Sequence, residues 1–166
     1  MIRAILAHDA FWGIGKDGGL PWPKNSDDLK WFKESTQGGV VVMGRKTWES
    51  LPVKPLPGRT NAIVTTQPIE NALGNIVVDI DSLLEILPKM NYTQNVWIIG
   101  GAQLLERLLP YCDELWLNDV GGDYDCDTFL PKQEITRQFH MGSVEILSFG
   151  IVTKWIRNSK ENMYDR

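Results

Sequence analysis

The sequence predicts one α/β domain, in which a largely parallel sheet flanked by helices ends in an antiparallel edge. Three observations predict it. Short apolar runs with almost no polar alternation recur through the first hundred residues, which is typical of strands buried on both faces. Helical stretches alternate with these runs, and the last third of the chain alternates apolar and polar residues instead. A length of 166 residues, without an internal repeat or linker, suits a single domain over residues 1–166.

Each expected element follows from its local pattern. The apolar runs predict strands at Ile2–Ala7, Gly39–Met43, Asn61–Thr65, Ile76–Val78 and Val96–Ile99. The stretches between them predict helices at Ser26–Thr36, Lys46–Ser50, Asp81–Met90 and Ala102–Leu109. Asp81 and Ser82 suit a helix N-terminus, and Pro110 is expected to end the last helix. From about Leu115 onward, alternating segments such as Ser143–Trp155 predict antiparallel strands.

The composition excludes several classes of function. Apolar residues make up 43% and charged residues 23%, as in ordinary globular proteins, and a net charge of −4 argues against a nucleic-acid groove. No apolar run is long enough to cross a membrane. Two cysteines and two histidines are too few for a disulfide framework or a zinc site, so no metal is expected. The N-terminal segment reaches Asp9 too soon for a secretory signal, so we expect a soluble cytoplasmic protein.

Two segments share the order strand, glycine, helix. Gly44 follows the run Val40–Met43, and Gly100 follows Val96–Ile99. Glycine at such a junction lets a phosphate group approach the N–H groups of the helix N-terminus. Neither segment is a GxGxxG or Walker A motif. A lone junction of this kind is usually only a turn, but two of them, with Arg45 and Lys46 beside the first, leave anion binding and plain turns as equal alternatives.

Thr65 and Thr66 end the third expected strand. A site specific for NAD would usually place an acid near this strand end, to bond the ribose 2′-hydroxyl. Hydroxyl groups stand here instead, with Arg45 expected at a neighbouring strand end. This combination suits a 2′-phosphate and therefore NADPH. The alternative is a polar strand end without a ligand.

Asp28 is the most informative residue of the helix Ser26–Thr36. At 100° per residue, Asp28 and Phe32 lie on one face, flanked by Leu29 and Trp31. A carboxylate on an apolar face needs a polar partner or a function, and burial would raise its pKa toward neutrality. Such a group could exchange protons with a substrate. The alternative is that Asp28, like its neighbour Asp27, only favours the first turn of the helix.

Two further features suggest ligand binding. The segment from Asp9 to Asn25 is rich in Gly, Trp and Pro and is longer than most loops of compact domains, which suits a closing lid. Arg59 follows the rigid turn Pro55–Gly58, and its guanidinium could bind a carboxylate through two hydrogen bonds. An arginine in a turn is, however, usually solvated.

Together these segments closely resemble the dihydrofolate reductase family. The matching segments keep the family's order and spacing over essentially the whole chain: Gly15, Leu20-Pro21-Trp22, Asp28–Lys33, Met43–Ser50, Leu56–Arg59, Ile99–Ala102 and Asp127–Pro131. The resemblance implies an eight-stranded, mostly parallel sheet and NADPH-dependent reduction of 7,8-dihydrofolate. It also implies a monomer that binds antifolate-type inhibitors.

The resemblance further assigns site residues. Asp28 would hold the pterin and promote protonation of N5, assisted by Leu20 and Trp22, and Arg59 would take the glutamyl α-carboxylate. The substrate would also contact Ile5, Leu6, Ala7, Phe32, Leu51, Leu56, Ile99 and Asn118. The cofactor would contact Ala7, Gly13, Ile14, Gly15, Lys16, Asp17, Gly18, Gly19, Leu20, Gly44, Arg45, Lys46, Thr47, Thr65, Thr66, Gly100, Gly101, Ala102, Gln103, Leu104 and Leu105. The Gly100-Gly101 peptide matches a cis bond of the family.

The sequence departs from the family pattern in three places, one of which is the segment Pro23–Ser26 before the acid, which is one residue longer than in common bacterial forms. Asn118 stands where the family usually has a threonine bonded to the acid, and Leu105 replaces an aromatic residue beside the nicotinamide. Two other functions are compatible with the same fold: a pyrimidine reductase of flavin synthesis, and a folate- or nucleotide-binding module without catalysis. The setting of Asp28 and Arg59 argues against the first. The intact acid, lid and phosphate junctions argue against the second.

Overall fold

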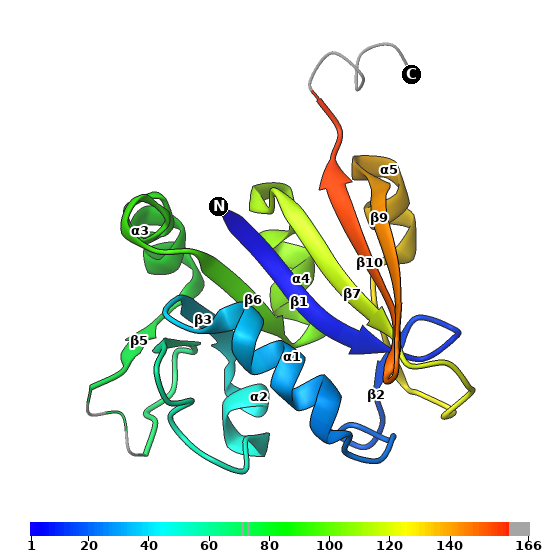
Figure 1. Ribbon diagram of the computed structural model, residues 1–166. Coiled ribbons are helices and arrows are strands. Elements are labelled where there is room, and N and C mark those ends of the chain that lie inside the picture. The colour runs from blue at the N-terminus through cyan, green and yellow to red at the C-terminus, as the bar shows by residue number, and fades with distance from the viewer. Residues whose placement is uncertain (71, 73, 160–166) are drawn as a thin grey trace.

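A twisted eight-stranded sheet forms the centre of the protein, as the computed structural model shows (Figure 1). The structure describes residues 1–70, 72 and 74–159. The strand order is β5-β4-β3-β6-β1-β7-β10-β9. In chain order the strands are β1 (Ile2–His8), β3 (Val40–Gly44), β4 (Thr60–Val64), β5 (Ile76–Val78), β6 (Val96–Gly100), β7 (Glu114–Asp119), β9 (Phe139–Leu147) and β10 (Gly150–Arg157).

The pairing confirms the predicted fold class. From β5 across to β7 every neighbouring pair is parallel, and β10 then pairs antiparallel with both β7 and β9. The central strands are apolar on both faces, and Val40–Met43 is completely buried. This explains why these strands could be recognised as continuous apolar runs.

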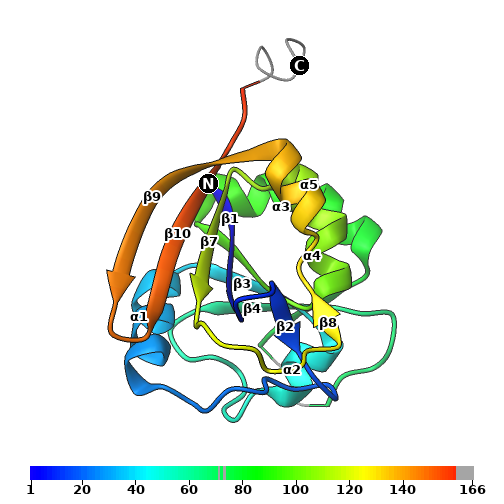
Figure 2. The ribbon, with the colours of Figure 1, turned by 90° about the vertical axis from the view of Figure 1, so that its right-hand side faces the viewer.

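Helices cover both faces of the sheet (Figures 1 and 2). On one face, α1 (Ser26–Thr36) and α2 (Arg45–Ser50) contribute Trp31, Phe32 and Trp48 to an apolar cluster with Ile5. On the other face, α3 (Ile80–Thr93), α4 (Ala102–Leu108) and α5 (Lys132–Gln138) pack on a larger cluster. Of the helices that the structure describes, none is both long and apolar enough to cross a membrane.

The helices differ from the prediction in several respects. Helix α3 begins at Ile80, because Asp79 accepts a hydrogen bond from the backbone N–H of Ser82 at 2.7 Å and is the N-cap. Pro110 does not simply end α4, which stops at Leu108 and continues as a 3-10 turn, η1 (Leu109–Tyr111), with Pro110 in it. Helix α5 was not expected at all; it is only seven residues long and no side chain caps it.

A second, two-stranded sheet also escaped sequence analysis. Strand β2 (Gly13–Gly15) pairs antiparallel with β8 (Thr128–Phe129), and Figure 2 shows the two side by side. This small sheet joins the expected lid to a segment more than a hundred residues later. Strands of two and three residues are too short to leave a periodic pattern in the sequence.

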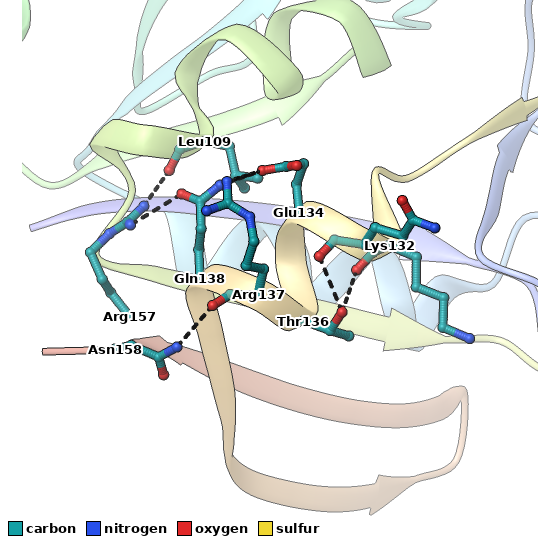
Figure 3. A network of polar contacts seen from close by, with 9 residues as sticks. Leu109, Lys132, Glu134, Thr136, Arg137, Gln138, Arg157 and Asn158 are labelled. Carbon is teal, nitrogen blue, oxygen red and sulfur yellow. Dashed lines mark hydrogen bonds and ion pairs between the residues drawn. The ribbon is translucent and has the colours of Figure 1, made fainter. Parts of the chain in front are cut away.

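Arg157, the last residue of β10, binds the backbone just after the C-terminal end of α4 (Figure 3). Its Nε donates to the carbonyl oxygen of Cys112 at 2.6 Å, and its Nη2 donates to that of Leu109. Nη1 donates to Gln138 Oε1 of α5 at 3.3 Å. An arginine at unsatisfied carbonyls stabilises the end of a helical segment. These contacts fix the C-terminal end of α4. The N-terminal end of α4 lies at the edge of the sheet where the candidate site is.

Candidate active site

Several predicted site residues lie at the carboxyl ends of the parallel strands, where ligands usually bind in open α/β sheets. Ala7 of β1 lies directly beside Asn118 of β7 in the sheet register. Gly44 ends β3 and Gly100 ends β6 on the other side of β1. Among the described residues, no His, Cys, Asp and Glu side chains group in a way that could hold a metal ion.

Asp28 is positioned by the start of α1. Asn25 is the N-cap of this helix, and its side-chain oxygen accepts hydrogen bonds from the N–H groups of Asp27 at 2.9 Å and Asp28 at 3.3 Å. The cap holds the first turn and so fixes where the Asp28 side chain lies. Asn25 was missed as a site-supporting residue, although an asparagine before Ser-Asp-Asp is a recognisable N-cap signal.

The Asp28 carboxyl is half-buried and has one polar side-chain partner. Nδ2 of Asn118 donates to its Oδ1 at 3.2 Å. Burial raises the pKa of Asp28 above its ordinary value, and the hydrogen bond from Asn118 opposes this rise only in part. Asp28 therefore lies in the first helical turn and is also a half-buried acid with a raised pKa, and its proton exchange with a substrate stays a prediction. The expected apolar flank is incomplete, since Leu29 is 54% exposed.

Asn118 is completely buried, and its own environment is unusual. Among the described residues its Oδ1 has no hydrogen-bond partner. A Cβ atom on Gly150 would lie 2.1 Å from this oxygen, so the asparagine side chain occupies space that only a glycine leaves open. The larger residue at the family's threonine position is thus matched by Gly150 of the neighbouring strand. Gly150 lies 32 positions from Asn118 in the sequence, and nothing in the residues around it predicts that the two are in contact.

Arg59 is half-buried and held in place rather than loose in solvent. Its Nη1 donates to Thr36 Oγ1 at 3.1 Å and its Nε donates to the carbonyl oxygen of Pro57 at 3.0 Å. The guanidinium carbon lies 5.9 Å from the centre of the Phe32 ring. Burial lowers the pKa of Arg59, but an arginine remains protonated. The structure therefore presents a fixed cation next to the residues of the expected substrate wall.

The predicted substrate wall is largely brought together. Four of its members are partly buried and pack against one apolar cluster on the α1 side of the sheet: Phe32, Leu51, Leu56 and Ile99. Leu6 and Ala7 are also partly buried, on β1. Ile5 belongs to the same cluster but is only 1% exposed, so it packs beneath the other wall residues and does not form part of the wall's surface.

The two glycine junctions face each other. A Cβ atom on Gly44 would lie 3.7 Å from the backbone nitrogen of Gly101, and one on Gly100 would lie 3.4 Å from Thr47 Oγ1. The Gly100-Gly101 peptide is cis, as the resemblance implies. Gly44 and Gly101 are the N-caps of α2 and α4, and no side chain caps either helix. Two N-termini with uncapped N–H groups, side by side, fit the phosphates of a dinucleotide.

Residues of the first turn of α4 divide between surface and core. Gln103 is exposed and Ala102 and Leu104 are partly buried, whereas Leu105 is completely buried in the larger apolar cluster. Leu105 therefore packs α4 against the apolar core. Its contact with the nicotinamide stays a prediction.

The expected 2′-phosphate corner carries exposed polar groups. Arg45 forms an ion pair with Glu49 at 2.8 Å, one turn along α2, and both side chains are about half exposed. Lys46 and Thr66 are exposed. Thr65 Oγ1 accepts a hydrogen bond from the backbone N–H of Gln67 at 3.1 Å, and its contact with a 2′-phosphate stays a prediction.

The lid segment is tied to the loop that precedes β8. The backbone N–H of Asp17 donates to Asp127 Oδ2 at 3.0 Å, and Lys16 pairs with Asp125 at 3.4 Å. Further along, Trp22 lies edge-on against Tyr124, with ring centres 5.7 Å apart. Leu20 is 67% exposed. The roles of Leu20 and Trp22 in catalysis stay predictions.

Comparisons with known proteins agree with this arrangement. The family model described as dihydrofolate reductase matches residues 1–146. The chain is 40% identical over 132 residues to dihydrofolate reductase of Bacillus subtilis, covering 80% of this chain and 76% of that protein. It is 37% identical over 150 residues to dihydrofolate reductase type 8 of Escherichia coli, covering 87% and 88%.

Longer relatives and a solved structure extend the comparison. A bifunctional dihydrofolate reductase-thymidylate synthase of Zea mays is 38% identical over 95% of this chain, which spans about a third of that protein's length. The structure of a dihydrofolate reductase from Enterococcus faecalis, complexed with NADP(H) and RAB-propyl, superposes with a TM-score of 0.81 at 30% identity, over 96% of this chain and 97% of that one. The sheet order, the poised acid on α1 and the family model agree, and the chain belongs to the dihydrofolate reductase family.

Proposed function

We propose that this protein reduces 7,8-dihydrofolate to 5,6,7,8-tetrahydrofolate with NADPH, and so sustains one-carbon metabolism and thymidylate synthesis. One observation carries the proposal above the others. A half-buried carboxyl with a raised pKa lies at the same sheet edge as two facing, uncapped helix N-termini. A poised acid and an anion cradle at one edge are what the reduction of a protonatable C=N bond by a phosphate-bearing cofactor requires.

Asp28 supports the protonation step. The reaction adds one hydrogen with two electrons to C6 of the pterin and one proton from solvent to N5. When bound, NADPH would supply the hydrogen and its two electrons, and the protein orients the two rings and directs the solvent proton to N5. Asp28 holds the pterin ring and favours delivery of the proton to N5 through water, and Asn118 holds the carboxyl in place.

Arg59 and the apolar wall orient the rest of the substrate. The guanidinium is fixed by Thr36 and by the carbonyl oxygen of Pro57, and it can bind the glutamyl α-carboxylate. The wall around Phe32 and Leu56 excludes water from the ring. Water exclusion strengthens every electrostatic contact inside the site.

We also propose a cytoplasmic monomer that is inhibited by antifolate-type molecules. The monomer is supported by the fact that one chain supplies the acid, the arginine and both glycine junctions. Inhibition is supported by the charge of Asp28, which attracts a protonated heterocycle into the site.

The absorbance of NADPH at 340 nm tests the proposed reaction. We expect the purified protein to consume NADPH only when dihydrofolate is present, with NADH as the cofactor control and heat-denatured protein as the blank. A pyrimidine reductase would instead respond to a ribosylated aminopyrimidine. A protein that binds both ligands without consuming NADPH would contradict the proposed catalysis.

A further inference from the structure

Asp9 is a buried carboxylate outside the expected active site, and its partners are all neutral donors. It follows β1 and is 1% exposed. Its Oδ1 accepts from the backbone N–H groups of Phe11 and Gly13, both at 2.9 Å. Its Oδ2 accepts from the N–H of Tyr124 at 3.2 Å and from the thiol of Cys126 at 3.4 Å. Burial opposes ionisation, but these donors outweigh it and lower the pKa of Asp9, so the group stays charged.

These hydrogen bonds connect two segments that are far apart in the sequence. The first is the start of the lid, residues 9–15, and the second is the loop of residues 120–128. The backbone reinforces the link, because the N–H of Ala10 donates to the carbonyl oxygen of Gly122 at 2.9 Å. A Cβ on Gly13 would lie 2.4 Å from Cys126 Cβ, so the segments approach as closely as a glycine permits.

The turn that begins at Asp9 is held rigidly. Trp12 has a φ of 65°, which a bulky side chain rarely adopts, and its backbone N–H donates to the carbonyl oxygen of Asp9 at 3.1 Å. The Trp12 ring stacks on His8 at 5.2 Å and contacts Trp155 edge-on at 5.9 Å. A strained conformation persists only where its surroundings enforce it, and here the carboxylate and the stacked rings do so.

The second oxygen of Asp9, Oδ2, is connected to the lid residue Trp22 through Tyr124. Asp9 holds the backbone of Tyr124, and the Tyr124 ring contacts the Trp22 ring. Strand β2, which begins at Gly13, belongs to the predicted cofactor-contacting segment. One carboxylate thus supports both ends of the lid, the first directly and the second through Tyr124.

We infer that Asp9 is a positioning residue for the proposed reduction: it fixes the 120–128 loop so that Tyr124 holds Trp22 over the active site. The inference rests on the proposed function. Because the hydrogen-bond partners of the Asp9 carboxylate all lie in the lid and the 120–128 loop, Asp9 affects how often the lid adopts its working position rather than how tightly substrate binds. Losing this support should lower kcat more than it raises KM.

Asp9→Asn tests the inference, with Asp119→Asn as the matched control. Asp119 also accepts a hydrogen bond from a loop N–H, that of Gly121 at 2.8 Å, but forms none with the lid. We expect Asp9→Asn to lower kcat about tenfold while the KM for dihydrofolate changes less than about threefold. Asp119→Asn should keep kcat within about twofold. Wild-type kcat in Asp9→Asn, assayed well below its melting temperature, would overturn the inference.

Substitutions of Tyr124 test the same route without touching the buried carboxylate. Tyr124→Ala should lower kcat by a similar factor and Tyr124→Phe should not, while Tyr111→Ala, a change at an exposed ring on η1, should be silent. In the double variant Asp9→Asn/Tyr124→Ala, we expect no loss beyond that of Asp9→Asn alone, because Asp9 acts on Trp22 through Tyr124. Losses that multiply would refute the connection.

Amide hydrogen exchange provides a readout that does not depend on activity. Asp9→Asn should speed exchange in peptides covering both residues 14–24 and residues 122–128, whereas Asp119→Asn, which loses only the hydrogen bond from Gly121, should leave both unchanged. If the wild-type protein oxidised no NADPH, the proposed reaction would be wrong, yet this exchange pattern would still show that Asp9 positions the lid through the 120–128 loop. Unchanged exchange in residues 14–24 of Asp9→Asn would overturn the inference that Asp9 positions the lid.

Discussion

Arg59 shows how a turn residue becomes a binding group once its neighbours are known. The guanidinium has two fixed partners and leaves Nη2 unassigned among the hydrogen bonds of the described residues. In the proposed function it binds the end of the substrate that does not react, and such binding is equal in the ground state and the transition state. Arg59→Ala should therefore raise the KM for dihydrofolate about ten- to a hundredfold with little change in kcat, which corresponds to roughly 1.5–3 kcal/mol.

Steady-state kinetics with two substrates checks this expectation. A truncated pterin without the glutamate should respond hardly at all to Arg59→Ala, and Arg107→Ala, at an exposed arginine of α4, should change neither substrate's KM. If both substrates lose affinity equally, Arg59 is structural and the carboxylate binds elsewhere.

Arg45 should decide between NADPH and NADH. A charge-assisted contact with the 2′-phosphate is worth roughly 1.5–3 kcal/mol, so the wild-type protein should prefer NADPH at least about tenfold. Arg45→Ala should erase most of that preference and leave the kcat/KM for NADH nearly unchanged. Lys30→Ala is the control, because Lys30 also pairs with a glutamate one turn away but lies on α1. An equal loss with both cofactors would mean that Arg45 serves the pyrophosphate or the fold.

At the scale of elements, strands β7 and β10 are fitted to each other through Asn118 and Gly150. A Cβ on Gly150 would meet Asn118 Oδ1 at 2.1 Å and the carbonyl oxygen of Asp119 at 2.5 Å. Gly150→Ala must therefore displace β10 or push Asn118 toward Asp28, and overpacking of this kind costs about 1–3 kcal/mol. Gly19→Ala, with nothing within 4 Å, is the control.

Chemical denaturation measures the free energy of unfolding of both variants. We expect a clear loss for Gly150→Ala and little for Gly19→Ala. Equal stability of the two would show that β10 adjusts freely and that the glycine is not required.

At the scale of the whole molecule, burial decided what the sequence could predict. Strand β5 and helix α1 have the predicted bounds, β1 and β6 end one residue later than predicted, and β3 and β4 are shifted by one residue. Strands buried on both faces are uniformly apolar, which makes them visible without knowledge of their neighbours. The acid on α1 and the glycine junctions could also be identified, because each lies in a local pattern.

The remaining features depend on contacts between distant segments. The pair β2–β8 and the hydrogen bonds of Asp9 to Tyr124 and Cys126 each join residues more than a hundred positions apart. Nothing in the local sequence distinguishes Asp9 from any aspartate after a strand. The same holds for Gly150, whose necessity follows from the side chain that folds against it.

The pH dependence of turnover in Asp28→Asn tests the central claim that a half-buried acid supports reduction of dihydrofolate. Burial raises the pKa of Asp28, so the proton-bearing form persists to higher pH than in an ordinary aspartate. The amide keeps the shape of the side chain but cannot support protonation. We expect normal folding and NADPH binding, and kcat lower by about 10²-fold or more at pH 7, with the deficit growing toward higher pH. Near-wild-type turnover at pH 7, or a deficit equal at every pH, would contradict the claim.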